Sequence, residues 1–237
     1  MPTKMSTIVG RVRIKLQETT ARFWTDAEIL EECNACVKDL WRAINMTHQN
    51  YWLKVEENLM TIVANTSVVA GVPADMTTLK GIEVTDEDSN LKFVYKDYNH
   101  PDFVAARASE AIDIEATDNI YVAVVNRGAP VGAPTIYIAP QVSSALTLRV
   151  SYIPTEPDLT LYDDNPIPGE SDKAIRDWAI SHCMAKINDE TKAPNAEWLA
   201  LYSTEKQNIL EFLLPRHDMD PICVEAVFER EWGGLGS

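Results

Sequence analysis

Residues 24–44 carry the feature that most constrains the fold, an amphipathic helix with a defined start. Thr25 and Glu28 form a capping box: the Thr25 hydroxyl accepts from the Glu28 amide, and the Glu28 side chain reaches back to the Thr25 amide. Trp24 before the cap and Ile29 at the fourth helical position can close a hydrophobic staple. The apolar residues that follow step by three and four, as in a bundle helix: Leu30, Cys33, Val37, Leu40 and Ile44. We therefore predict that four residues form the start of a bundle helix: Trp24, Thr25, Glu28 and Ile29.

Two cysteines on this helix form a C-x-x-C pair, a spacing that occurs in redox centres and zinc sites. A redox thiol usually lies at a helix N-terminus, whereas Cys33 lies about two turns inside. A zinc site needs a second ligand pair, and the adjacent His182 and Cys183 point about 100° apart on a helix. We interpret Cys33 and Cys36 as packing residues and His182 as a core histidine.

Other signals of catalysis are also weak. The acidic run from Asp86 to Asn90 resembles a calcium loop, but Leu91 stands where that loop needs glycine, which favours a polar hairpin turn. The chain has no phosphate-binding glycine loop, no H-E-x-x-H and no G-x-S-x-G. The sequence therefore predicts no catalytic residue, no metal and no cofactor, hence no enzyme.

The pattern of the chain changes from helical to β and back. Runs rich in Val, Ile, Thr and Tyr alternate with turn formers, at 59–64, 79–85, 91–98, 119–126, 135–139 and 145–153. Helical spacing returns after Pro168, with Ser171 and Asn195 as candidate caps.

We expect an α+β fold in which N- and C-terminal helices form a bundle around an inserted antiparallel β-sandwich or barrel-like block. The expected divisions are 1–50 for the N-terminal helices, 51–165 for the β block, 166–214 for the C-terminal helix pair and 215–237 for an extended tail.

The charge of the chain limits its partners. The formal net charge is −15, and DNA-gripping proteins need clustered Lys and Arg, so DNA would pass this surface without specific binding. Residues 1–22 are the exception, with five basic residues against one acidic residue. A short helix over 7–16, with a Ser6 or Thr7 cap, would thus meet an acidic neighbour within the chain or on another subunit.

The chain has no run of about 18 apolar residues, and basic residues interrupt its N-terminal apolar stretch, so we expect no membrane span and no signal peptide. Four cysteines without a secretion signal indicate reduced thiols.

Three motifs, taken in order, resemble those of tailed-phage head–tail adaptor proteins. Trp24–Leu30 is similar to the family's aromatic-T-D-x-E-[IL] helix start, and Ala70–Asp75 resembles its small-x-x-P-x-D entry into the β block. Asn165–Pro168, followed by Ile175 and Trp178, resembles its proline-flanked entry to the C-terminal helices. The resemblance spans residues 5–213.

This resemblance implies a non-enzymatic virion protein at the head–tail junction, made in the host cytoplasm. Such adaptors form dodecameric rings under the portal protein, extend the DNA channel and carry the tail or nozzle protein. We expect the segment 219–237 to dock on the portal or on a neighbouring subunit, through four apolar residues: Ile222, Val227, Phe228 and Trp232. Three alternatives stay open: another tail ring such as a stopper or nozzle, a cytosolic β-sandwich binding module, and a thiol- or metal-dependent enzyme that uses Cys33, Cys36 and Cys183.

Overall fold

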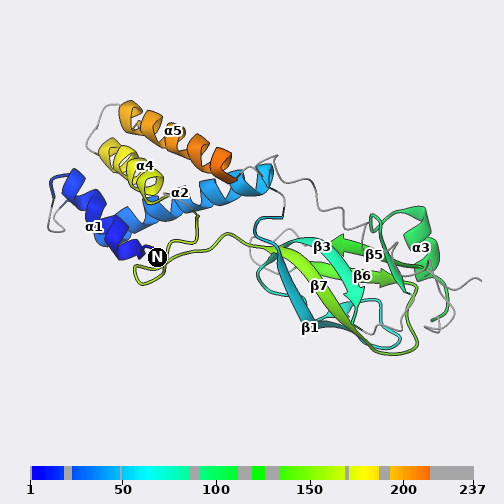
Figure 1. Ribbon diagram of the computed structural model, residues 1–237. Coiled ribbons are helices and arrows are strands. Elements are labelled where there is room, and N and C mark those ends of the chain that lie inside the picture. The colour runs from blue at the N-terminus through cyan, green and yellow to red at the C-terminus, as the bar shows by residue number, and fades with distance from the viewer. Residues whose placement is uncertain are drawn as a thin grey trace, which may run out of the picture. The chain divides into compact units, whose positions relative to one another are not determined.

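The chain folds into two compact units, which are described separately. A computed structural model describes residues 2–18, 23–48, 50–85, 91–111, 119–125, 134–168, 171–186 and 193–213. One unit combines Met1–His48 with Asp158–Ser237, and the other is Gln49–Pro157 (Figure 1). The chain thus returns to the helical unit at Asp158, eight residues before the boundary expected from the sequence.

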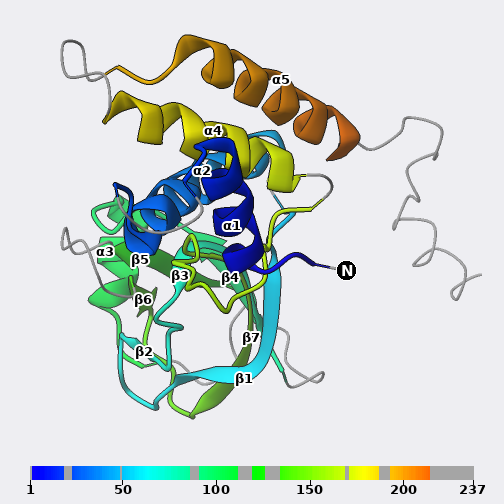
Figure 2. The ribbon, with the colours of Figure 1, turned by 90° about the vertical axis from the view of Figure 1, so that its left-hand side faces the viewer.

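The helical unit contains α1 (Met5–Lys15), α2 (Asp26–Thr47), α4 (Ser171–Ala185) and α5 (Ala196–Leu213). Helix α4 lies between α1 and α5 and packs against both, while α2 contacts all three (Figures 1 and 2). Helix α2 buries the predicted seam, including Cys33, Val37 and Leu40. Among the described helices, none is both long and apolar enough to cross a membrane.

The starts of the helices show how far local sequence determines them. The predicted capping box is present at Thr25 and Glu28, and the Asn195 side chain accepts from the amides of the first turn of α5, as predicted. The cap predicted at Ser6 or Thr7 is wrong, because α1 begins at Met5 without a side-chain cap.

A distant segment takes the place of that cap. The amides of Met5 and Ser6 donate to the carbonyls of Asp163 and Leu161, both at 3.0 Å. The unpaired donors of the first turn are thus satisfied by a loop that follows the β unit in sequence, which no local pattern reveals.

The β unit contains two sheets. The first has the order β2-β1-β7-β3, with β1 Lys54–Ile62, β2 Val69–Ala70, β3 Met76–Val84 and β7 Leu146–Pro154, all antiparallel. The second has the order β4-β5-β6, with β4 Lys92–Tyr95, β5 Asn119–Val125 and β6 Thr135–Ala139. The Val68–Tyr137 bridge, with the Ile138 amide donating to the Ser67 carbonyl at 2.9 Å, joins the two sheets beside β2 and β6.

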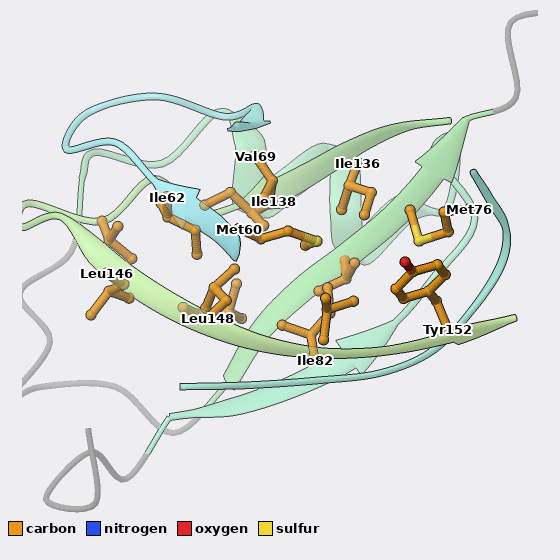
Figure 3. Packing of buried hydrophobic residues seen from close by; sticks show 14 residues of the cluster. Met60, Ile62, Val69, Met76, Ile82, Ile136, Ile138, Leu146, Leu148 and Tyr152 are labelled. Carbon is orange, nitrogen blue, oxygen red and sulfur yellow. The ribbon is translucent and has the colours of Figure 1, made fainter. Parts of the chain in front are cut away.

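One core fills the space between the sheets (Figure 3). Met60 and Ile62 enter it from β1, and Ile136 and Ile138 enter from β6, all fully buried. Their period of two matches the pleat, which sends alternate side chains to one face. Helix α3 (Pro101–Arg107) covers the other face of the second sheet, where Phe103 is fully buried, so this sheet is apolar on both faces.

One strand pair departs from the expected antiparallel block. Strands β4 and β5 pair in parallel, Lys92 with Asn119 through Tyr95 with Val122. Parallel neighbours need a long crossover, and the connection from β4 to β5 contains α3. The antiparallel pairing expected for the whole β block is therefore wrong for β4 and β5. The α+β class is confirmed, with five helices and curled, mainly antiparallel sheets in the described residues.

Gly71 provides a test of the β unit. It has φ +77°, and a Cβ built on it would lie 2.3 Å from the Leu59 carbonyl oxygen. Gly71→Ala should therefore destabilise the β unit by about 2 kcal/mol or more, measured as the urea midpoint. Gly81→Ala is the matched control, because its Cβ would meet Ser151 Cβ at an ordinary 3.7 Å. Equal urea midpoints for the two variants would contradict the close approach of Gly71 to Leu59.

Candidate functional site

The three cysteines in the described part of the chain offer no reactive centre. Cys33, Cys36 and Cys183 are free and buried. Burial raises the pKa of Cys183 to about 12 and raises the pKa values of Cys33 and Cys36 as well, so the neutral thiol dominates at physiological pH. The Cys36 thiol lies 3.9 Å from the Ala174 carbonyl oxygen. This environment agrees with their interpretation as packing residues.

His182 likewise has a structural environment. Its ring stacks on Trp178, with centroids 4.3 Å apart, and Nδ1 lies 3.0 Å from the Trp178 carbonyl oxygen. The ring is half-buried rather than core. Within the described ranges, no group of three or more His, Cys, Asp or Glu side chains is placed to hold a metal ion.

Two predicted features lie outside the described residues. The acidic run Asp86–Asn90 is one of them. The other is the segment after Leu213, which includes all four predicted docking residues: Ile222, Val227, Phe228 and Trp232.

A groove of about 550 Å³ lies where β3 and β4 separate. Five of its eight lining residues are apolar, among them Ile82, Val84 and Phe93, and the polar ones are Glu83, Lys92 and Asn119. Glu83 is directed to an ion pair with Arg149 at 3.7 Å. The lining contains neither His nor Cys, and it gives no acid–base pair.

The first motif, Trp24–Leu30, anchors α2 to the rest of the helical unit. The Trp24 indole N–H donates to the Cys183 carbonyl at 3.2 Å. The Lys186 ammonium donates to Glu28 Oε1 at 2.6 Å, while the Thr25 amide donates to Glu28 Oε2 at 2.7 Å. The Lys186 contact, followed by the Thr25 contacts, lowers the pKa of Glu28 from 4.5 to about 2. The capping residues therefore tie the start of α2 to the end of α4.

A buried arginine joins α1 to the same place. Arg13 is 7% exposed. Its guanidinium donates to Asp26, with Nη2–Oδ1 at 2.6 Å, and to the Trp24 carbonyl at 2.9 Å. Arg11 pairs with Asp172 at 3.1 Å and Lys4 with Asp164 at 3.0 Å. The basic N-terminal helix thus meets acidic neighbours within the chain, one of the two predicted alternatives.

The second motif, Ala70–Asp75, clamps the ends of two strands. Lys54 of β1 and Tyr152 of β7 are register partners. Asp75 accepts from Lys54 Nζ at 2.8 Å and from the Tyr152 hydroxyl at 3.1 Å, and its carbonyl accepts from the Thr155 amide. The Lys54 contact lowers the pKa of Asp75, whereas burial and Asp75 raise that of Tyr152 to about 12.

The third motif, Asn165–Pro168, holds the start of α4. Asn165 is 7% exposed. Its Nδ2 donates to Ser171 Oγ at 2.8 Å and to Asp172 Oδ1 at 3.0 Å, while its Oδ1 accepts from the Ile167 amide. Its own amide donates to the Thr3 carbonyl at 2.9 Å. Asn165 thereby joins the N-terminus to α4, a role that the sequence reasoning missed because an Asn before Pro reads only as a turn.

The exposed apolar side chains of the helical unit are the remaining candidates for binding. Ile14 on α1 is 66% exposed, Phe212 on α5 is 70% exposed, and Met46 and Leu201 also face solvent. Helix α5 buries only Tyr202 and Ile209 among its 18 residues. A contiguous exposed apolar patch is typical of an interaction surface, whereas single exposed apolar residues are common on any protein.

Buried packing thiols, structural polar clamps and exposed apolar helix faces describe a structural interaction protein. The family model described as SU10 adaptor protein matches residues 3–220. The chain therefore belongs to the SU10 adaptor family, which confirms the resemblance to phage adaptor proteins drawn from the three motifs. No curated protein matches the chain. Membership implies a virion component that assembles with phage head and tail proteins.

The lowered pKa of Glu28 predicts how stability depends on pH. A depressed carboxyl pKa adds stability above the unfolded value near 4.5, and this contribution is lost as the pH falls toward about 2. The loss of stability between pH 7 and pH 3 should thus be smaller in Glu28→Gln than in the unchanged protein, as measured by urea unfolding. Glu31→Gln, an exposed position on α2, is the control, and a Glu28→Gln profile parallel to that of the unchanged protein would contradict the prediction.

Proposed function

We propose that this chain is the head–tail adaptor of a tailed phage, a non-enzymatic virion protein at the head–tail junction. It docks beneath the portal, extends the DNA channel and provides the platform for the tail. The match of the SU10 adaptor model over residues 3–220 carries this proposal. The buried thiols and the structural use of the polar motif residues support it, because they leave those residues without a catalytic role.

The helical unit is the proposed ring-forming part, and the β unit the part directed outward or to the tail protein. The ring has twelve copies in the family that the motifs resemble. Exposed apolar residues on α1 and α5 support assembly through helices.

The ring would let DNA pass without binding it specifically. A net charge of −15 gives little attraction for phosphate, and three N-terminal basic residues, Lys4, Arg11 and Arg13, are engaged by Asp164, Asp172 and Asp26. We place acidic side chains of the helical unit or its loops on the channel wall. A strongly basic inner surface in an image of the ring would contradict this placement.

Electron microscopy of the purified chain, alone and mixed with portal rings of the same phage, tests the function. We expect a ring stacked under the portal. A chain that attaches only to a preformed adaptor or tail complex would instead be a stopper or nozzle ring, the nearest alternative. A chain that remains monomeric with portal and with tail proteins would be a cytosolic β-sandwich binding module, and either result would overturn the proposal.

The C-terminal segment is the proposed attachment to the portal or to a neighbouring subunit, through Ile222, Val227, Phe228 and Trp232. Deleting 219–237 should lower co-sedimentation with portal rings at least about tenfold, since aromatic anchors dominate interface energies. Deleting only 233–237 is the matched control, because it keeps all four residues. Unchanged attachment after the longer deletion would refute this role.

A further inference from the structure

Four residues on the exposed face of α1 surround a hole between side chains. Thr7, Gly10, Arg11 and Ile14 follow the spacing i, i+3, i+4, i+7, which outlines one hole on a helix surface. Thr7, Arg11 and Ile14 are exposed. A Cβ built on Gly10 would have no described atom within 4 Å, so this corner of the hole is open space.

Glycine at this position requires an explanation. A glycine inside a helix costs stability relative to alanine. Among the described residues, no atom lies within 4 Å of the place where a Gly10 side chain would begin. The space therefore suits a side chain from outside, as in helix packing where a residue of one helix enters a four-residue hole of another.

Helix α5 presents a side chain that fits such a hole. Leu201 and Phe212 are 42% and 70% exposed. They lie eleven residues apart, which is about three turns, so they share one face. The exposed charged residues of α5 are Glu197 and Glu211, whereas those of α1 are Arg11 and Lys15. Arg11 already pairs with Asp172, so Lys15 is the residue that makes the α1 face complementary in charge to the acidic α5 face. The open corner at Gly10 also gives room for an exposed aromatic ring.

Helices α1 and α5 lie on opposite sides of α4 (Figures 1 and 2). We propose that the partner of each face is a second copy of this chain: Phe212 of one copy enters the hole of Thr7, Gly10, Arg11 and Ile14 on the next. Such a contact uses different surfaces on the two copies, so it repeats and generates a ring or a filament. A contact between the α5 helices of two copies would instead bring the acidic residues Glu197 and Glu211 of both copies together. The proposal rests on the proposed adaptor function and names the contact between ring subunits.

Cysteine cross-linking tests the contact in full-length chains that carry Cys223→Ser, alone and with portal rings. The Ile14→Cys/Phe212→Cys double variant should give a ladder of covalent oligomers on oxidation. An equal mixture of the two single variants should stop at the covalent dimer, because only one cross-linkable contact can form. The control Ile14→Cys/Ser203→Cys uses an exposed residue on the opposite side of α5 and should give no ladder.

Gly10→Leu separates assembly from folding. It fills the hole with a better helix former, so the melting temperature should stay or rise while the ladder of the double variant falls at least tenfold. Absence of a ladder from chains that attach to portal overturns this contact and leaves the adaptor function in place. A ladder from chains that do not attach to portal supports the contact and overturns the adaptor function. An undiminished ladder in Gly10→Leu overturns the contact.

Discussion

The antiparallel pairing of β1 with β7 is the constraint on which both units depend. The chain leaves the helical unit after His48 and returns at Asp158, so the helices can pack only if the two ends of the inserted unit are close together. Lys54 and Tyr152, near those ends, are register partners. Asp75 clamps both side chains through its carboxylate. Because the folded β unit already holds these two ends together, packing of the helices does not carry the entropic cost of closing a long flexible loop.

A second closure of the same kind holds the helical unit together. The Asn34 side chain makes two hydrogen bonds with the Leu159 backbone, at 2.8 and 3.2 Å. Asn165 then links the N-terminus to α4, with its amide on the Thr3 carbonyl. These contacts satisfy buried polar groups that would otherwise each cost about 1–3 kcal/mol.

The sequence predicted the features that local physics determines. The Thr25–Glu28 box, the Asn195 cap and the strand over 135–139 depend on residues within a few positions of one another, and all three are present. Strand β1 was predicted too short, because its first six residues are exposed and show no alternation of burial. The start of α1 was missed, since its partners Leu161 and Asp163 lie far away in sequence. The role of Asn165 was missed because an Asn before Pro reads only as a turn. Among the candidate sites, only the helix start could be compared with described residues.

The polar motif residues hold each unit together, so fewer surface residues are left for contacts between copies. The polar motif residues form their hydrogen bonds within the chain, as Trp24, Asp75 and Asn165 show. We therefore expect contacts between copies to use other residues. The high negative charge opposes association of copies in general. Local attraction is therefore needed at the contact, and in the proposed contact the exposed Lys15 of α1 supplies it. The salt bridges of α1 to Asp26 and Asp172 leave Ile14 and the open side of Gly10 facing outward. One helix thus closes its own unit with one face while its other face stays open to a neighbour.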